Sequence, residues 1–211
     1  MILSPTSENL TKCAELILSD ALIAVPTETV YGLAGNALSE KAASKIFEVK
    51  QRPMTDPLII HCHDFEQACN YFEINQAIER LATALWPGPL TIVGIKKDII
   101  PNIITSGQET IALRIPENPV FRKLIQLVNT PLAAPSANPF GYISPTEAIH
   151  VERTLGGKIS AILDGGRCHH GLESTIIDLR DPENPILLRH GPYGKKQIEL
   201  FLDHTIRTVC K

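Results

Sequence analysis

Short apolar stretches alternate along this chain with longer segments in which apolar residues recur every three or four positions. The stretches at 21–26 and 57–62 are apolar almost throughout and are bounded by proline, which is typical of buried strands. Stretches of the same kind predict further strands at 90–95, 110–116, 131–135, 161–166, 174–179 and 185–191. The pattern therefore predicts about seven or eight strands.

Helices are predicted where a capping residue precedes an apolar stripe of helical spacing. Ser39, Asn75 and Asn118 each stand before such a stripe, and each offers a side-chain oxygen to the free N–H groups of a first turn. Pro119 suits the first position of the third helix. Pro53 is expected to end the first helix, because proline cannot continue a helix interior.

A fourth helix is predicted after Ser144. The run Ser-Pro-Thr-Glu at 144–147 has the form of a capping box, and Gly156 or Gly157 would end the helix. With about four or five helices among the strands, the chain is predicted to be an α/β domain. The last three strands follow one another without intervening helices, which favours a mixed sheet over a purely parallel one.

Composition narrows the class of protein. The 211 residues are 44% hydrophobic and 20% charged, enough to bury a large core in one large or two small domains. No window has the roughly 18 apolar residues of a membrane span, and the N-terminus lacks the order of a signal peptide. The five cysteines are odd in number and form no CxxC, so we expect reduced thiols in a cytoplasmic protein.

Polar residues gather where the predicted strands end. The segment 26–36 follows the first strand and is interpreted either as a turn entering a helix or as a ligand loop. Lys50 and Arg52 lie at the end of a helix, where cations complement the helix dipole; together they also suit a polyphosphate. His61 alone is more often a core histidine than a ligand.

The segment 133–146 has the most unusual sequence in the chain. It carries Ser136 and Asn138 after a strand, and then a glycine turn before the predicted cap at Ser144. A helix N-terminus there would offer free N–H groups to an anion, although Ser144 also has a sufficient role as a cap. No P-loop motif occurs. Ser174 and Arg189 lie at the edges of late strands.

The runs His-Cys-His at 61–63 and Cys-His-His at 168–170 could together supply four zinc ligands. The usual spacing of two to four residues between ligands is missing. Adjacent residues of a strand also point to opposite faces of a sheet. We therefore predict no metal site built by the protein.

Taken together, these segments resemble the YrdC-like family of threonylcarbamoyl-AMP synthases. The resemblance is carried by PTETVYGLAGNA, KIFEVKQRPMTDPLIIH, WPGPLTIV, ALRIPENP, PLAAPSANPFGYISPT, ILDGG, GLESTIIDL and LLRHGPY, which span residues 21–193 in order. It implies a twisted mixed sheet with flanking helices around a concave, positively lined cavity. It also implies the short form of the family, a single domain over residues 1–211.

The resemblance implies a reaction and a set of site residues. L-threonine, bicarbonate or CO2, and ATP would give threonylcarbamoyl-AMP and pyrophosphate, with Mg2+ carried mainly by the triphosphate. Lys50 and Arg52 would be the catalytic cations. ATP would be bound by Lys50, Arg52, Thr110, Ser136, Asn138, Ser144 and Arg189. Threonine would be bound by Thr29, Tyr31, His61, Arg114 and Ser174.

The resemblance also implies partners. Other proteins would transfer the threonylcarbamoyl group to adenosine 37 of tRNAs that read ANN codons, and tRNA would be a further binding partner of the chain itself. One alternative is a module that binds double-stranded RNA or tRNA without catalysis; the net charge of −3 and the few aromatic residues weaken it. Another is a carbamoyl-handling enzyme with a different acceptor, which would turn over without threonine.

Overall fold

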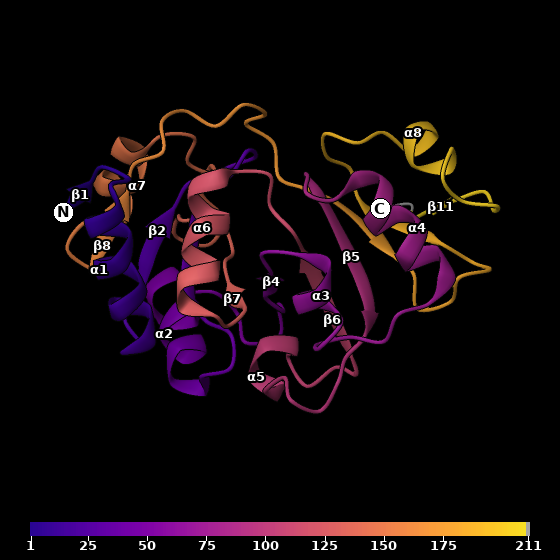
Figure 1. The fold of residues 1–211 in the computed structure, drawn as a ribbon, viewed down its shortest axis with the longest axis horizontal. Helices are drawn as coiled ribbons and strands as arrows, with labels where there is room; N and C mark the ends of the chain where they lie inside the picture. The colour runs from indigo at the N-terminus through magenta and orange to yellow at the C-terminus, as the bar shows by residue number, and fades with distance from the viewer. Residues whose placement is uncertain (210–211) are drawn as a thin grey trace.

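The computed structural model describes residues 1–209, which form eleven strands in one sheet and eight helices (Figure 1). The strands are β1 (Ile2–Leu3), β2 (Ile23–Val25), β3 (Gly32–Asn36), β4 (Ile59–His61), β5 (Leu90–Ile95), β6 (Thr110–Arg114), β7 (Leu132–Ala133), β8 (Ala161–Leu163), β9 (Thr175–Asp178), β10 (Ile186–Arg189) and β11 (Arg207–Thr208). The helices are α1 (Ser7–Leu18), α2 (Glu40–Lys50), α3 (Phe65–Ala68), α4 (Gln76–Leu85), α5 (Asn102–Thr105), α6 (Pro119–Val128), α7 (Ala148–Leu155) and α8 (Lys195–Glu199).

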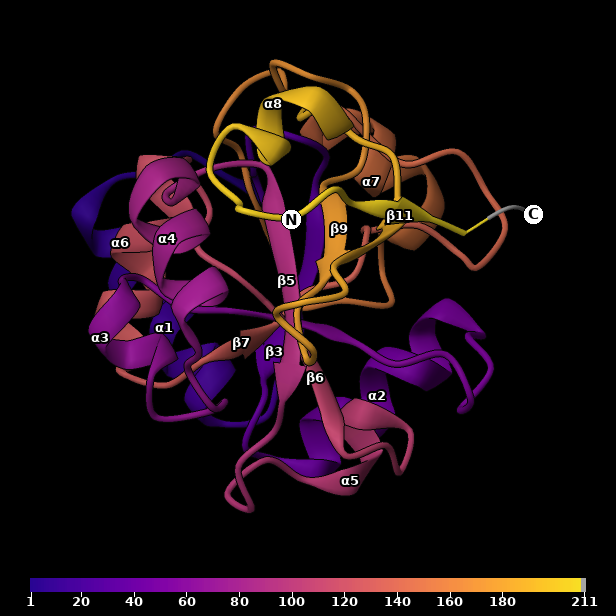
Figure 2. The ribbon, with the colours of Figure 1, turned by 90° about the vertical axis from the view of Figure 1, so that its right-hand side faces the viewer.

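The sheet is mixed and twisted, as predicted. Its strand order is β1-β8-β2-β3-β7-β4-β6-β5-β9-β10-β11. Pairs such as β4 with β6 and β5 with β9 are parallel, whereas β3 with β7 and β5 with β6 are antiparallel. Figure 2 looks along the sheet from the side of β5 and β9 and shows helices on both sides of it. The N-terminus and the C-terminal segment lie at opposite ends of the sheet (Figure 1).

Three predicted helix starts are confirmed by their caps. The side chains of Ser39, Asn75 and Asn118 each accept a hydrogen bond from a backbone N–H of the first turn of α2, α4 and α6. Helix α2 ends at Lys50, because the next residue, Gln51, adopts a left-handed conformation with φ of 53°. Pro53 therefore lies in the following turn and does not itself stop the helix.

Two local predictions are wrong. Helix α7 starts at Ala148 with Glu147 as its N-cap, so the 144–147 run is not a capping box; its N-terminal part is an extended connection. The segment 26–36 does not enter a helix but continues into strand β3, because residues 32–36 pair with β2 and β7. Helix α1, the short helices α3, α5 and α8, and strands β1 and β11 were not predicted at all.

The core consists of two clusters of buried apolar side chains. The smaller one joins helices α1 and α6, which pack against each other, to strands β2 and β8. The larger one joins α2, α4 and α7 to the rest of the sheet. No helix within residues 1–209 is long and apolar enough to cross a membrane. The helices thus fix the sheet and leave the loops at the ends of its central strands free to form a site.

Candidate active site

The central strands place a cavity over one face of the sheet. Parallel strands β4 and β6 pair in a register that puts His61 beside Arg114, at the carboxyl ends of both strands. Ile59 points to the same side as His61 because alternate residues of a strand share a face. Twelve residues line this first cavity: Thr29, Val30, Arg52, Ile59, His61, Arg114, Ala134, Pro135, Ser136, Glu173, Ser174 and Arg189. Strand ends in α/β sheets are where ligands ordinarily bind.

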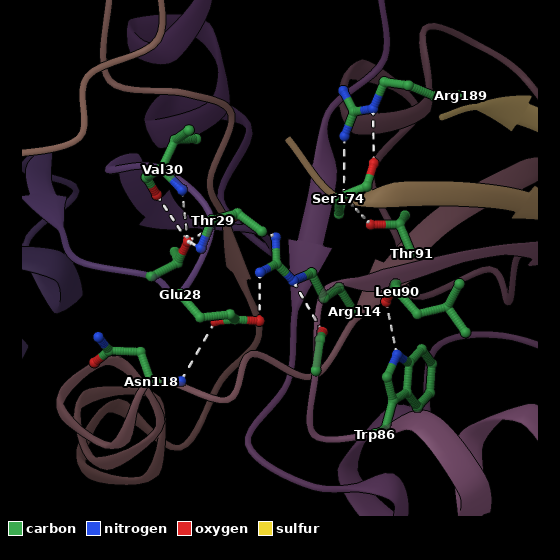
Figure 3. Close-up of polar contacts among 12 residues, drawn as sticks. Glu28, Thr29, Val30, Trp86, Leu90, Thr91, Arg114, Asn118, Ser174 and Arg189 are labelled. Atoms are coloured by element: carbon green, nitrogen blue, oxygen red, sulfur yellow. Dashed lines mark hydrogen bonds and ion pairs between the residues drawn. The ribbon is translucent and has the colours of Figure 1, made fainter. Parts of the chain in front are cut away.

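Arg114 is held at one end of the cavity by a buried ion pair. Its Nη2 donates to Glu28 Oε1 at 2.5 Å, its Nη1 to Thr29 Oγ1 at 3.0 Å and its Nε to the Gly88 carbonyl at 3.3 Å. The side chains of Arg114 and Glu28 are only 5% and 3% exposed. Figure 3 shows Glu28 and Thr29 on one side of the guanidinium group and a carbonyl on the other. The guanidinium thus has one orientation toward the cavity.

Burial changes the acid–base behaviour of this end. Burial alone would raise the pKa of Glu28, but the charge and hydrogen bonds of Arg114 outweigh it and leave the pKa lowered. Burial, and then the nearby charge of Arg114, lower the pKa of His61 well below its ordinary value, so His61 is neutral near pH 7. His61 is buried, and within the described residues its Nδ1 has no hydrogen-bond partner. A buried polar atom without a partner at the wall of a cavity indicates a ligand contact.

A second cluster of hydrogen-bonded polar side chains lies at the start of β9. Arg189 donates from Nε to the Ser174 carbonyl and from Nη2 to Ser174 Oγ, both at 2.9 Å, and Ser174 Oγ lies 2.7 Å from Thr91 Oγ1 (Figure 3). Arg189 also pairs with Glu173, whose other oxygen accepts from Ser144 Oγ at 3.1 Å. Ser144 therefore reaches the cavity through Glu173 and is not among the residues that line it.

Arg52 stands between the first cavity and a second one. Its Nη2 pairs with Asp56 at 2.9 Å, and Nη2 and Nε also donate to the carbonyls of Pro57 and Asp56. The second cavity, of about 300 Å³, shares Arg52, Ile59 and Arg189 with the first. The rest of its lining mixes apolar side chains with polar and charged ones. Thr110 lines this second cavity. A polar cavity rich in guanidinium groups thus adjoins a larger, more apolar one.

Lys50 corrects the prediction of a second cation facing the ligand. Its side chain is 1% exposed and does not line either cavity. The ammonium group instead donates to the carbonyls of Ser136 and Asn138, at 2.5 and 2.6 Å, and lies 3.3 Å from Asn138 Oδ1. An ammonium group has three donors, and these three oxygens use all of them.

Two further predicted site residues, Asn138 and Tyr31, do not line the cavity either. Asn138 is buried, and its Nδ2 donates to the Tyr142 carbonyl at 2.5 Å. The Tyr31 hydroxyl donates to the Gly166 carbonyl at 2.8 Å and lies 3.2 Å from Asp164 Oδ1, outside both linings. Seven predicted residues do meet at the first cavity: Thr29, Arg52, His61, Arg114, Ser136, Ser174 and Arg189.

Sequence reasoning missed the two carboxylates of the site. Glu28 pairs with a residue 86 positions away, and Glu173 lines the cavity between Ser144 and Arg189. The signal for Glu28 was present, because a carboxylate inside an apolar strand–loop segment must find a buried cation. Glu173 gave no such signal, because an acidic residue at a strand edge is ordinary.

The histidine and cysteine runs do not meet. His61 lines the first cavity, whereas His169 and His170 lie with Cys168 at a separate surface depression. Within residues 1–209 no three His, Cys, Asp or Glu side chains are placed to share a metal ion. Cys13, Cys62 and Cys168 are buried free thiols, and Cys69 is partly exposed. Cys210 lies outside the described residues.

Comparison with known proteins gives the family. The model of the Sua5/YciO/YrdC family, described as "Telomere recombination", matches residues 15–191. The chain belongs to this family. It is 49% identical over 187 residues to the threonylcarbamoyl-AMP synthase of Pyrococcus abyssi, covering 88% of this chain and 55% of that protein. It is 41% identical over 204 residues to that of Bacillus subtilis, covering 95% and 58%.

A solved structure agrees with the fold throughout. The crystal structure of P. abyssi Sua5 complexed with L-threonine matches with a TM-score of 0.96 at 44% identity, covering 99% of this chain and 62% of that one. This Sua5/YciO/YrdC chain therefore spans little more than half the length of these relatives.

Proposed function

We propose that this protein is an L-threonylcarbamoyladenylate synthase. One observation carries the proposal: a single cavity is lined by three guanidinium groups, those of Arg52, Arg114 and Arg189, and by buried, neutral His61. Guanidinium forks match carboxylates and phosphates, the anionic groups of threonine and ATP. The names of the relatives and the threonine complex of one of them support the same substrate.

The two ends of the first cavity divide the substrates. Threonine belongs at the end of Thr29, His61, Arg114 and Ser174, where a fixed guanidinium meets its carboxylate and neutral His61 accepts a hydrogen bond from its ammonium or hydroxyl group. The triphosphate belongs beside Arg52, Ser136 and Arg189, with the nucleoside in the second cavity near Thr110. Ile59 and His61, two residues apart on one strand face, set the distance between the subsites.

The proposed reaction balances without a covalent enzyme intermediate. The threonine amine adds to CO2 or bicarbonate to give a carbamate, with water lost when bicarbonate is used. A carbamate oxygen then attacks the α-phosphorus of ATP, and pyrophosphate leaves. The guanidinium groups stabilise the charge that builds on the phosphate oxygens. The product would serve other proteins that modify adenosine 37 of tRNAs reading ANN codons.

The lining residues fit a Mg2+ ion that arrives on the triphosphate. Within the described chain, Glu173 is the one carboxylate that lines the first cavity, and it already pairs with Arg189 and Ser144. Phosphate oxygens and water would therefore supply most of the ligands, as Mg2+ commonly requires. The ion would neutralise phosphate charge when bound.

Pyrophosphate release tests the proposal. ATP is supplied with Mg2+, and L-threonine and bicarbonate are omitted in turn; release is expected only when both are present. Release without threonine would indicate another acceptor, and no release from the folded protein would overturn the synthase. Arg52→Met should lose release, whereas Arg122→Met, an arginine on α6 outside both cavities, should keep it.

A further inference from the structure

The segment 135–145 forms a wall of the first cavity without regular secondary structure of its own. Ala134, Pro135 and Ser136 line the cavity, and Ser136 pairs with Gly32 as an isolated bridge. Its ends are tied to the sheet by backbone bonds: Leu33 N–H donates to the Pro135 carbonyl at 2.7 Å. Something must also fix the middle of the segment, because an irregular loop has few bonds within itself.

Helix α2 supplies that fixation through its last residue. Lys50 Nζ donates to the Ser136 and Asn138 carbonyls, and the Lys50 carbonyl accepts from Phe140 N–H at 2.7 Å. Asn138 then extends the network, since its Nδ2 donates to the Tyr142 carbonyl at 2.5 Å. Four bonds thus connect the helix end to residues 136–142, counting the contact of Nζ with Asn138 Oδ1, and a fifth bond lies within the segment.

Lys50 and Arg52 have different roles although they are two residues apart. Gln51 between them is left-handed, so the chain turns and the two side chains diverge. Arg52 lines both cavities, and its guanidinium lies 5.9 Å from the Phe140 ring of the same segment. Burial, and then the charge of Arg52, lower the pKa of Lys50 to about 8. The ammonium group is thus well desolvated, and its donors are committed to carbonyl oxygens.

We propose that Lys50 and Asn138 are positioning residues, which lock segment 136–142 so that Ser136 faces the cavity, and that neither touches the bound nucleotide. The proposal refines the proposed function, since the locked segment is the wall beside which the triphosphate is placed. Protein oxygens alone satisfy the three donors of Lys50, so the lock acts by preorganisation and not by direct charge on the phosphates.

Hydrogen exchange of the ligand-free protein, followed by mass spectrometry, tests the lock directly. Lys50→Met is expected to speed exchange of peptides covering 136–142 by about tenfold. Lys45→Met is the matched control: it removes a cation of the same helix whose ammonium group donates to the Asp20 carbonyl, and it should leave this exchange unchanged. If Lys50→Met also leaves the exchange unchanged, the proposal is overturned.

Kinetics add a readout that separates positioning from contact. Lys50→Met should raise the KM for ATP about tenfold. Asn138→Ala removes the side-chain contact with Lys50 and the bond to the Tyr142 carbonyl without changing any charge, and it should raise the same KM. The double variant should then be little worse than either single one, because both act on one lock. Fully additive effects would instead make Lys50 an independent ligand contact and overturn the proposal.

The two experiments keep this proposal apart from the proposed function. Exchange is measured without substrate, so it reports on the lock even if pyrophosphate is never released. If Lys50→Met fails to fold, Asn138→Ala carries the same test of exchange, with an expected increase confined to 136–142. An increase spread evenly over the whole chain would show general destabilisation and overturn the proposal.

Discussion

The two ends of the first cavity present the same chemical group in opposite settings. Arg114 is 5% exposed and is fixed by Glu28, Thr29 and Gly88, all of them protein groups. Arg52 is 16% exposed, and its carboxylate partner Asp56 is 43% exposed. A buried pair depends on both members, whereas a solvated pair contributes little to stability. One end is therefore part of the core, and the other is available to respond to a ligand.

Removing Arg114 should have the largest effect. Arg114→Met leaves the Glu28 carboxylate buried without its cation, so the free energy of unfolding should fall by about 3–5 kcal/mol. Urea denaturation followed by circular dichroism measures this fall. The double variant Glu28→Gln/Arg114→Met leaves no unpaired charge and should recover most of the stability without recovering pyrophosphate release. A double variant as unstable as the single one would contradict the comparison.

Removing Arg52 should separate activity from stability. Arg52→Met is expected to slow pyrophosphate release about 100-fold, because a cation aimed at the developing phosphate charge is lost. Its free energy of unfolding should change by less than about 1 kcal/mol, since the pair with Asp56 is partly solvated. A pyrophosphate-release assay measures the rate, and the same urea titration measures the free energy of unfolding. A stability loss as large as that of Arg114→Met would show that the two ends do not differ.

His61 should give the buried end a specific acid sensitivity. The pKa of His61 is well below 6.5 in the folded protein because of burial and Arg114, so the unfolded chain binds its proton first as pH falls. Stability should therefore drop below about pH 6.5, by up to about 1.4 kcal/mol per pH unit for this one proton. His61→Asn should show a shallower decline between about pH 6.5 and 5. Equal slopes in both proteins would mean that His61 is charged when folded.

The local sequence pattern was enough to predict the strands and helices that carry the site. It was not enough to predict which strands and side chains pair with one another. The strands at 57–62 and 110–116, which contain His61 and Arg114, were predicted separately, and the helix that carries Lys50 was predicted from its cap. That β4 lies beside β6 is a property of the whole sheet, whose order no local window contains. The same holds for Glu28, whose partner lies 86 residues along the chain.

The direction of a side chain was the other missing information. Lys50 and Arg52 read as a matched pair because nothing in the residue type of Gln51 signals a left-handed conformation, which glycine or asparagine adopts more readily. That one dihedral sends Lys50 into the core and Arg52 to the cavity. Backbone conformation therefore decides where each of the two side chains lies.

The smallest effect is expected from a neutral side chain in the second cavity. Thr110 lines that cavity, and its hydroxyl already donates to Gln108 at 3.2 Å. Thr110→Val keeps the shape of the side chain and removes its hydroxyl group. One neutral hydrogen bond is worth about 0.5–1.5 kcal/mol. The KM for ATP should therefore rise by about two- to tenfold, and the KM for threonine should stay unchanged in steady-state assays. A larger change in the threonine KM than in the ATP KM would place Thr110 with the Arg114 end. It would contradict the assignment of the nucleoside to the second cavity.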